Sequence, residues 1–574
     1  MSLKPKLNNL LFINGFWTPT NIIDELLSNV QTDSNIFLTF PLGIMTIAGC
    51  CRQAFPFLEI QLLDFMMELH KVFFNPEKTE TDFDSFVTKT LLDTCFKPDI
   101  IAISLGSSNG HMPNQRLMGI CKKIWPKSQI VVGGMHATAF THRMIQNSDI
   151  DYIIRGPGDI AFVELVGHLL EERDPMQIPG VVTGPDTISS MALPLKNLDS
   201  LPMYPYDLID MEYLLVNDAT APIFRNGSRT AMVITSRGCP FGCTYCAANQ
   251  IHGKKVQFYS IDRVVSEIVY LIQTYNVNQI CIIDDLFGAD KKFFFDFFKT
   301  VDALKLKFNI VIPAGLSLRI YDETMIDALI EHGLDSVYFP LESGSQYVQD
   351  NVIKKGIHLE KAARLITHAK SKNIFTGVNI VLGSPGETRE MMLETRDFLK
   401  NLTVDWVAFF SAYPYPGTEM TRILLERGDI NEDQLIALWD NSTQGFKKRS
   451  FDTEEIKGEE LADLVYDFNI ELNFFNNHNI RANNFSHIIP KLDKIIERYP
   501  FHVVAIVCRA KCYYNQGLKD QALDDLKNIS LLIHQNRESF KMFEKYKSTI
   551  LDFIGTQIAE SGFQNEFGVL HETP

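Results

Sequence analysis

Short apolar runs alternate with helical patterns along the first 190 residues of the chain. The apolar runs are continuous and lie at residues 8–15, 60–66, 98–106, 128–136 and 151–159. Amphipathic helical patterns, with apolar residues every three or four positions, lie at 114–125 and 160–172. Apolar strands separated by such helices predict a parallel sheet covered on both faces. We therefore expect a doubly wound, Rossmann-like α/β domain over residues 1–190.

Small residues follow successive strands of this predicted sheet. Ligands of doubly wound folds bind beyond the carboxyl ends of the strands. A single glycine there is most simply a tight turn, but a set of small residues lets a flat, bulky ligand approach the backbone. The residues that form this set are Ser104, Gly106, Ser107, Gly133 and Gly134.

A connecting segment and a second α/β region come next. Residues 191–225 contain four prolines and no clear period, which indicates a linker. Strand patterns then recur at 230–238, 279–285, 309–319, 336–344, 375–384 and 404–414. Helical patterns follow them at 260–275, 290–306, 322–332, 359–372 and 389–401. Six consecutive strand–helix units predict a partial (βα)6 barrel of the TIM type over 226–445, with its chemistry at the C-terminal ends of the strands.

Helical periodicity dominates the last part of the chain, residues 446–574. Residues 510–529 are typical of one tetratricopeptide-type helix pair, with Gly517 at the turn and Ala522 as the small packing residue. One repeat cannot bury its own apolar face. We therefore expect a helical domain that caps the barrel.

Composition and charge narrow the class of protein. The 574 residues are 45% hydrophobic and 22% charged, a balance typical of globular chains. The formal net charge of −16 disfavours a nucleic-acid substrate. Residues 36–51 are too short and too interrupted to span a membrane, and a buried strand running into a helix explains them better. Ten cysteines with no leader segment favour free thiols or metal ligation in a cytoplasmic protein.

Functional groups concentrate at the strand ends of the predicted barrel. Such regular placement on one rim favours a site over scattered surface polarity. The residues at these ends are Asp284, Asp285, Ser317, Arg319, Glu342, Ser343 and the segments 383–387 and 413–418.

Three cysteines share the loop after the first barrel strand. Cys239, Cys243 and Cys246 have C-x3-C-x2-C spacing. A structural zinc needs a fourth ligand, and a redox C-x2-C pair needs no third cysteine. Thiolate ligation of an iron–sulfur cluster fits best, and three ligands leave one iron of a 4Fe–4S cluster open for chemistry.

This loop, with Tyr245 as its aromatic residue, resembles the radical S-adenosylmethionine (SAM) superfamily. Residues 316–346, 353–356, 381–388 and 413–420 carry further matches along the barrel. The resemblance implies that the cysteines bind a 4Fe–4S cluster whose open iron binds S-adenosyl-L-methionine, and that one electron cleaves SAM to a 5′-deoxyadenosyl radical.

The same resemblance assigns the other strand-end residues. Glu342 and Ser343 suit the ribose or the amino group of SAM, and Arg319 suits its carboxylate. Gly383, Pro385 and Gly386 would give the adenine a flat backbone wall, and Tyr245 would shape that pocket. Asp284 and Ser317 are the remaining implied SAM contacts.

The N-terminal region resembles the cobalamin-binding domain found in one subgroup of these enzymes, which includes the class B radical SAM methyltransferases. The matching segments are 40–49, 98–108, 130–138 and 151–165. The Asp-x-His-x-x-Gly loop of many cobalamin domains is replaced by residues 14–21, which contain no histidine. His111 and His136 are alternative cobalt ligands, although each is more simply a turn histidine. The small residues at the strand ends are the better cobalamin contacts, and a scaffold without cobalamin is the alternative.

The resemblance implies a cobalamin-dependent radical SAM methyltransferase. Its substrate would be an unactivated carbon, or the phosphorus of a phosphinate, in a small molecule held between two tightly packed domains. The methyl group would pass through methylcobalamin, and the reductant would be an electron donor such as flavodoxin or ferredoxin. The alternatives are ring formation, rearrangement or oxidation with the same cofactors, and a non-catalytic sensor.

Overall fold

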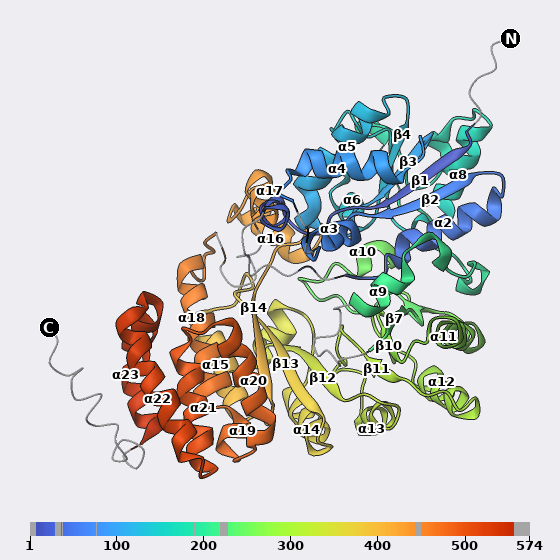
Figure 1. Ribbon diagram of the computed structural model, residues 1–574. Helices are drawn as coiled ribbons and strands as arrows, with labels where there is room; N and C mark the ends of the chain where they lie inside the picture. The colour runs from blue at the N-terminus through green and yellow to red at the C-terminus, as the bar shows by residue number, and fades with distance from the viewer. Residues whose placement is uncertain are drawn as a thin grey trace.

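The structure is a computed structural model with an N-terminal sheet, a set of barrel strands and a bundle of helices at the C-terminal end (Figure 1). It describes residues 7–555 except for 29–35, 37, 76, 78, 188–189, 218–227, 442–448 and 450. The end of the predicted linker, residues 218–225, and the predicted barrel boundary at 445/446 lie outside the described residues.

A mostly parallel sheet forms the N-terminal part, as the apolar runs predict. Its described strands have the order β2-β1-β3-β4-β5-β6, and only the β5–β6 pair is antiparallel. The strands are β1 (Asn9–Asn14), β2 (Glu59–Asp64), β3 (Ile100–Ser104), β4 (Gln129–Gly133), β5 (Tyr152–Ile154) and β6 (Val181–Val182). The sequence pattern missed β6, because two apolar residues leave no recognisable period.

Helices cover both faces of this sheet. They are α1 (Thr20–Leu27), α2 (Leu42–Ala54), α3 (Phe65–Phe73), α4 (Phe83–Thr94), α5 (His111–Ile124), α6 (Met135–Ala139), α7 (Thr141–Met144) and α8 (Gly158–Leu170). Leu10 and Phe12 face the cluster formed with α2 and α8, while Leu11 and Ile13 face the opposite core. This alternation follows from the two-residue period of a strand, and it confirms the doubly wound prediction.

The segment at 36–51 is mainly helical. Leu38 makes a single β-bridge, and α2 begins at Leu42. Among the described residues, no helix combines the length and the apolar character needed to cross a bilayer.

The second sheet system contains the six predicted barrel strands in chain order. They are β7 (Thr230–Val233), β10 (Gln279–Ile282), β11 (Asn309–Val311), β12 (Ser336–Glu342), β13 (Phe375–Leu382) and β14 (Trp406–Ser411). They form two parallel three-stranded sheets, ordered β11-β10-β7 and β12-β13-β14. In the described residues a single parallel bridge, between Ile310 and Leu334, links the two sheets. The arc is therefore an open, partial barrel, as predicted.

One predicted barrel strand is wrong in length. The apolar pattern at 309–319 extends over eleven residues, but β11 ends at Val311. Pro313 has no backbone N–H, and Gly315 has φ +75°. A Cβ on Gly315 would lie 2.2 Å from the Tyr338 carbonyl oxygen. The chain therefore turns there, and Ser317 and Arg319 follow on a loop.

The helices between the barrel strands lie within three residues of their predicted bounds. They are α11 (Ile261–Tyr275), α12 (Lys291–Ala303), α13 (Glu323–Glu331), α14 (Leu359–Ser371) and α15 (Arg389–Lys400). Ser260, Asp290, Asp322 and Thr388 each cap one of these helices with a side-chain oxygen. Such caps mark helix starts in sequence, which explains the accuracy of the prediction.

The C-terminal region is helical, as predicted. The helices after the barrel are α16 (Glu419–Arg427), α17 (Glu432–Asp440), α18 (Gly458–Ile470), α19 (His478–Arg481), α20 (Phe485–Arg498), α21 (Val503–Asn515), α22 (Lys519–Gln535) and α23 (Arg537–Ile554). Gly517 has φ +82° in the α21–α22 turn, and Ala522 is buried. Both residues have the positions expected of them.

A π-helical segment joins this helical region to the barrel edge. Within Glu471–Phe475, the Asn473 side chain donates to the Val407 carbonyl at 2.7 Å and accepts from its N–H at 2.8 Å. Val407 belongs to β14, the outer strand of its sheet. The helical region therefore covers a strand edge that would otherwise present unpaired backbone groups.

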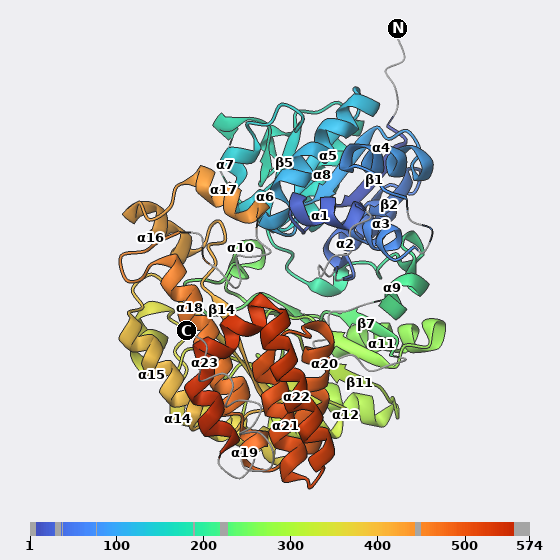
Figure 2. The ribbon, with the colours of Figure 1, turned by 60° about the vertical axis from the view of Figure 1, so that its left-hand side comes forward.

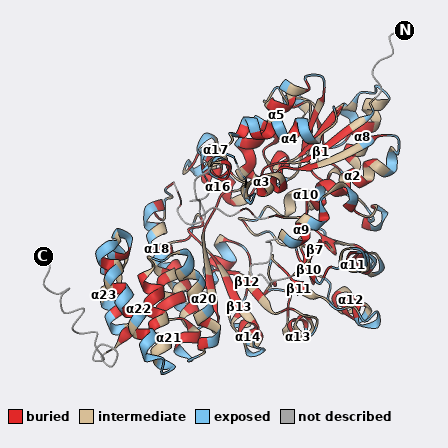
Figure 3. Ribbon diagram, viewed as in Figure 1, coloured by how far each residue is buried: buried red, intermediate tan, exposed pale blue. Residues whose placement is uncertain are grey.

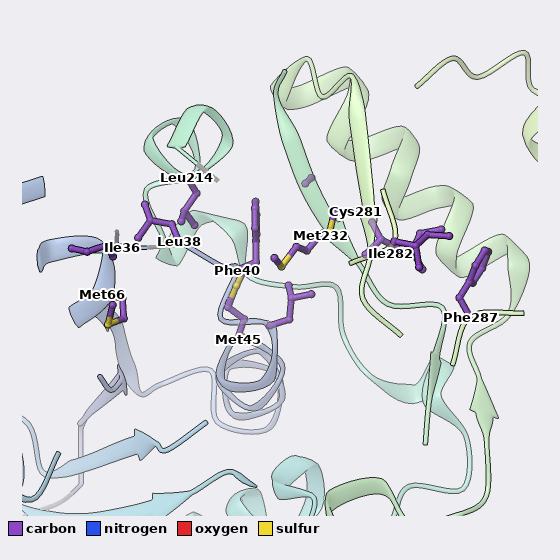
Figure 4. Close-up of a cluster of buried hydrophobic side chains, with 14 of the residues drawn as sticks. Ile36, Leu38, Phe40, Met45, Met66, Leu214, Met232, Cys281, Ile282 and Phe287 are labelled. Atoms are coloured by element: carbon purple, nitrogen blue, oxygen red, sulfur yellow. The ribbon is translucent and has the colours of Figure 1, made fainter. Parts of the chain in front are cut away.

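The apolar core is continuous from the N-terminal sheet to the barrel. Figure 4 shows Phe40 and Met45 beside Leu214 of α9 (Met211–Asn217) and Met232 of β7, all within one buried cluster. Buried residues concentrate in the strands and on the inward faces of the helices (Figure 3). The two sheet systems therefore pack tightly, as the predicted substrate position requires.

Candidate functional site

The three-cysteine loop begins at a glycine with a positive φ angle. The loop follows β8 (Ser236–Arg237), which pairs antiparallel with β9 (Gln257–Phe258). The sequence pattern did not predict this small hairpin. Gly238 has φ +95°, and a Cβ there would lie 2.6 Å from the Lys255 carbonyl oxygen. Its N–H donates to Asp285 Oδ2 at 2.8 Å. Only glycine fits this position, so this residue sets the direction in which the loop leaves the hairpin.

The rest of the loop is held from the barrel side. The Thr244 N–H donates to the Ile353 carbonyl at 3.0 Å, and the Thr244 carbonyl accepts from the Met420 N–H at 2.8 Å. Cys239 and Cys243 are half-buried and Cys246 is exposed, and all three are free thiols. In the described part of the chain, no three His, Cys, Asp or Glu side chains are placed to hold a single metal ion. A cubane cluster makes a different demand, because each thiolate binds a different iron.

A buried lysine lies beside the thiols. Lys355 Nζ donates to Glu342 Oε1 at 2.7 Å and to Tyr245 Oη at 3.1 Å, and Tyr245 Oη donates to the same carboxylate oxygen at 3.2 Å. Glu342 and Lys355 are 6% and 9% exposed, so their ion pair is shielded from solvent. Sequence reasoning missed Lys355, although it lies in the matched segment 353–356.

Two opposing effects act on the cysteine thiols. Burial raises the pKa of all three, that of Cys243 to about 11, while the Lys355 charge acts to lower them. Metal ligation needs the thiolate form. A cation next to these three thiols therefore fits a site that holds several thiolates at once.

Two predicted SAM contacts, Asp284 and Ser343, form hydrogen bonds that link the ends of the barrel strands to neighbouring segments. Asp284 accepts hydrogen bonds from the Thr235 N–H at 2.6 Å and from Ser236 Oγ at 2.7 Å, and burial raises its pKa to about 6. Ser343 is fully buried, with its hydroxyl 3.0 Å from Thr395 Oγ1. These bonds join the ends of strands to neighbouring elements, so both side chains shape the rim.

The loop after β13 is held by its own residue Glu387 and by Arg449, which follows the barrel strands in sequence. Glu387 Oε2 accepts from the N–H groups of Gly383 and Ser384 at 2.8 and 3.1 Å. Arg449 Nη1 donates to the Gly383 carbonyl at 2.7 Å. Gly383 has φ +82°, and a Cβ there would meet Leu461 at 2.4 Å. The half-buried Pro385 lies at the turn of this loop, and the sequence pattern gave no sign of Arg449.

Ser317 and Arg319 lie on the loop after β11. Ser317 is half-buried, and its carbonyl accepts from the N–H groups of Ile320 and Tyr321. The exposed Arg319 guanidinium lies 3.9 Å from the centre of the Phe241 ring. The structure therefore places Arg319 against the cysteine loop.

A cavity of about 290 Å³ lies at the carboxyl ends of β3 and β4. Its lining includes four predicted cobalamin contacts: Ser104, Gly106, Gly133 and Gly134. Arg237 and His252 of the barrel also line it. A Cβ on Gly106 would meet nothing within 4 Å, so the backbone there faces open space. This position beyond the strand ends suits a ligand of the doubly wound sheet.

A second cavity, of about 450 Å³, joins the two sheet systems. Gly106 and Ser107 line one side, and Tyr245, Cys246 and Asp285 line the other. In Figure 1 the short helix α10 (Asn249–His252), which follows the cysteine loop, lies between the N-terminal sheet and the barrel. Two of the candidate cobalamin contacts, Gly106 and Ser107, and the cysteine loop therefore face one shared space.

The two candidate histidine ligands bond each other. His136 Nε2 lies 2.8 Å from His111 Nδ1, and His136 Nδ1 lies 2.9 Å from Ser108 Oγ. Burial lowers their pKa values, to about 3 for His136 and about 4 for His111. Both nitrogens of the neutral His136 ring are engaged, as in the simpler turn-histidine interpretation.

Helix α17 secures this histidine pair. The Trp439 ring packs edge-on against His111, His136 and Phe140. Its Nε1 donates to the Pro414 carbonyl at 3.0 Å. Figures 1 and 2 both show α17 against the N-terminal part, although it follows the barrel in sequence. One tryptophan thus contacts His136, which lines the shared cavity, and bonds to the segment after β14.

Comparison with protein-family models identifies two domains. Residues 233–399 match the Radical SAM superfamily, and residues 37–166 match the B12 binding domain. The cysteine loop and the glycine-lined strand ends fall within these matches.

The chain is similar to a named methyltransferase and to solved cobalamin-dependent enzymes. The chain is 26% identical over 473 residues to cytidylyl-2-hydroxyethylphosphonate methyltransferase of Streptomyces wedmorensis, covering 76% of this chain and 86% of that protein. The fold of this chain resembles that of TsrM from Kitasatospora setae, a radical S-adenosylmethionine methyltransferase solved with cobalamin and a [4Fe-4S] cluster. The TM-score is 0.54 at 16% identity, and the match covers 74% of this chain and 76% of TsrM. The fold also resembles that of OxsB, a cobalamin-dependent S-adenosylmethionine radical enzyme (TM-score 0.59, 13% identity, 94% and 81% coverage).

Proposed function

This chain belongs to the cobalamin-binding radical SAM enzymes, and we propose that it transfers a methyl group to an unactivated carbon, or to a phosphinate phosphorus, of a small molecule. The named methyltransferase of Streptomyces wedmorensis supports methyl transfer. The observation that carries the proposal is the shared cavity of about 450 Å³, which Ser107 and Cys246 line from opposite sides.

The cysteine loop would hold the 4Fe–4S cluster through Cys239, Cys243 and Cys246. When bound, the cluster with S-adenosyl-L-methionine supplies a carbon-centred radical, and cobalamin supplies the transferable methyl group. Lys355 pairs with Glu342, and its positive charge would offset part of the charge of the three thiolates. Gly238 and Thr244 fix the path of the loop that carries these cysteines.

The other rim residues would bind SAM. Tyr245 and Glu342 would contact its ribose or amino group, since their hydroxyl and carboxylate lie beside the loop. The Gly383–Pro385 backbone would face adenine, and Arg449 holds that loop. Arg319 and Ser317 would reach the carboxylate end. Asp284 and Ser343 would act by keeping the strand ends in register.

Cobalamin would occupy the cavity at the ends of β3 and β4. Its contacts would be the backbone and hydroxyls of the small residues there, namely Ser104, Gly106, Ser107, Gly133 and Gly134. No side chain bulk stands between the Gly106 backbone and the cavity, which is the space that a planar macrocycle needs. His136 would support this wall through its bonds to His111 and Ser108.

The remaining assignments follow from this function. We propose a cobalamin-binding domain at 1–190, a linker at 191–225, the radical SAM barrel at 226–445 and a helical domain at 446–574. Enzymes of this type need a reductant, so an electron donor such as flavodoxin or ferredoxin would be a partner, and nucleic acid would not. The ten cysteines, all in the thiol form, support a cytoplasmic location.

The test begins with anaerobic protein reconstituted with iron, sulfide and cobalamin. Iron and cobalt per chain are measured first. The protein is then given SAM that is isotopically labelled in its methyl group, and a strong chemical reductant. We expect about four irons and one cobalt, together with release of 5′-deoxyadenosine. Label should appear on cobalamin and then in a candidate phosphonate or alkyl substrate.

Matched variants separate the outcomes. The triple variant Cys239→Ala, Cys243→Ala, Cys246→Ala should lose iron and 5′-deoxyadenosine but retain cobalt, whereas Cys281→Ala, a buried cysteine of β10, should retain all three. Turnover without label transfer would favour ring formation, rearrangement or oxidation. Absence of both metals and of 5′-deoxyadenosine would contradict the enzymatic proposal.

A further inference from the structure

Asp285 places a carboxylate in the wall of the shared cavity. It follows β10 and lines the cavity of about 450 Å³ beside Cys246. Its Oδ2 accepts from the Gly238 N–H at 2.8 Å. In the part of the chain that the structure describes, its other carboxylate oxygen accepts no hydrogen bond and Asp285 forms no ion pair. One oxygen of this carboxylate is therefore available to a ligand.

The charge of Asp285 is not balanced within the cavity wall. Among the described residues that line the cavity there is no lysine and no arginine. His136 lines it, and burial lowers the pKa of this imidazole to about 3, which keeps the ring neutral. Lys355 bonds Tyr245 nearby, but its charge is paired with Glu342 at 2.7 Å. A ligand in the cavity therefore meets negative charge.

The rest of the cavity wall is mostly apolar or aromatic. These lining residues are Met135, Ala139, Tyr245, Ala247, Ala248, Tyr415 and Pro416. Met135 is 36% exposed, so a ligand can remove apolar surface from water by covering its side chain. The wall thus suits a molecule that has an apolar body and one cationic group.

We propose that the methyl acceptor is a small amine with an apolar body, bound through its ammonium group to Asp285; the proposal deepens the proposed function and rests on it. An ammonium group donates a strong, charge-assisted hydrogen bond to a carboxylate oxygen. Because the Gly238 N–H holds the other oxygen, the carboxylate presents a fixed anchor. The apolar body, which carries the carbon to be methylated, would lie against Met135 and Tyr415.

An anionic acceptor fits this cavity less well. Phosphonate and phosphinate groups are bound best by arginine forks and other cationic donors. In the described lining, such an anion would meet the Asp285 carboxylate instead, and like charges at close range repel. The proposal therefore selects a carbon acceptor over a phosphinate phosphorus, and preference for a phosphonate is an outcome of the test.

The anchor also lies next to the loop that would hold the cluster. Asp285 bonds Gly238 at the start of that loop, and its charge acts on the thiols of Cys239 and Cys246. Ser107 lines the opposite wall of the same cavity. An amine bound to Asp285 would therefore be positioned between the candidate cluster loop and the candidate cobalamin contacts, and such positioning lowers the barrier to reaction.

The test measures the binding of three probes that share one apolar body. Phenethylamine, phenethyl alcohol and phenethylphosphonate differ in the charge at one end. Equilibrium dialysis gives their dissociation constants on the reconstituted holoenzyme, without a reductant, so that no turnover is needed. We expect the amine to bind about 10-fold more tightly than the alcohol or better, and the phosphonate to bind most weakly.

Matched variants assign the preference to one side chain. Asp285→Asn removes the charge but retains an oxygen that can accept from the Gly238 N–H. It should weaken amine binding about 10-fold or more, while its affinity for the alcohol and its iron content stay at the wild-type level. Asp262→Asn makes the same change at an exposed residue of α11 and should bind all three probes like wild type.

Three results would overturn the proposal: tightest binding of the phosphonate, equal affinities for the amine and the alcohol, or unchanged amine binding in Asp285→Asn. Displacement of the amine by excess SAM would place Asp285 in the SAM site and would overturn it as well. The proposed function fails separately, through absence of iron and of 5′-deoxyadenosine, so the two hypotheses are distinguished.

Discussion

Arg237 donates from one guanidinium nitrogen to both carboxylate oxygens of Asp159, at 3.1 and 2.9 Å. Both side chains are 8% exposed. Arg237 belongs to the barrel hairpin and Asp159 to α8 of the N-terminal sheet, so this buried ion pair crosses from one domain to the other. Both residues also line the cavity at the ends of β3 and β4. The pair thus holds the two cofactor-binding parts together.

Removing one member of this pair should lower the stability of the folded protein. Arg237→Met leaves the Asp159 carboxylate buried without a partner, and we expect the free energy of unfolding to fall by about 3–5 kcal/mol. The double variant Arg237→Met/Asp159→Leu should recover most of that loss. Urea unfolding checks both. Arg422→Ala, which breaks an exposed pair with Glu426, should change stability by less than about 1 kcal/mol. Equal effects of the two single variants would contradict the buried-pair interpretation.

Lys355 should affect how firmly the cluster is held. Replacing it with methionine removes the cation beside the three thiols and leaves Glu342 unpaired. We expect the apparent affinity for iron to fall by about 10-fold or more, as for other groups that support metal ligands. Iron retained per chain during a chelator challenge measures this. Lys354→Met, at the exposed neighbour that pairs with Glu419, should retain iron like wild type.

Glu387 should make stability depend on pH. Burial raises its pKa to about 7, from an ordinary value of 4.5. The folded protein therefore holds this proton more tightly than the unfolded chain, and stability is lost as pH rises from about 4.5 to 7. Relative to Glu387→Gln, which cannot ionise, wild type should lose about 2–4 kcal/mol over that range.

Unfolding midpoints at pH 5 and pH 8 test this sign. The stability of the Glu387→Gln variant relative to wild type should be greater at pH 8 than at pH 5. Glu390→Gln is the control, because the Glu390 pKa is lowered by hydrogen bonds to the backbone and to Thr388. The difference in unfolding midpoint between this control and wild type should be almost the same at pH 5 and pH 8. A constant difference for Glu387→Gln would contradict the raised pKa.

Asn473 should control the attachment of the helical region. Asn473→Ala leaves the buried N–H and carbonyl of Val407 without partners, which should cost about 2–3 kcal/mol. Hydrogen exchange at the Val407 amide should speed up, with little change at Ile380 in the neighbouring strand. Asn441→Ala, on an exposed helix end, should leave both amides unchanged. Unaltered exchange at Val407 would contradict the edge-capping role.

Local patterns explain why much of the fold could be predicted. The helix at 261–275 is marked by the Ser260 cap and by a strong apolar stripe, and both signals lie within one segment. The strand at 309–311 was predicted too long, because an apolar run does not show where Gly315 turns the backbone. β6 and the β8–β9 hairpin are two residues per strand and carry no period.

The site was predictable to the extent that its chemistry is local. The spacing of the cysteines placed three thiols on one loop, and the glycines at 133–134 marked a strand end. Arg449 could not be found in this way, because it bonds Gly383 from 66 residues away in the chain. Lys355 was overlooked for the same reason, since nothing near it in sequence shows that its charge lies beside Cys243.

The sequence by itself determined the order of the strand–helix units, the three-cysteine loop and the small residues at the sheet ends, because each depends on neighbours within one turn, strand or loop. Only the tertiary structure decided that Ser107 and Cys246 line one cavity, that Lys355 pairs with Glu342 beside the thiols, and that Arg237 meets Asp159. These relationships depend on how separate elements pack, and burial then makes their charges strong by removing the water that would screen them.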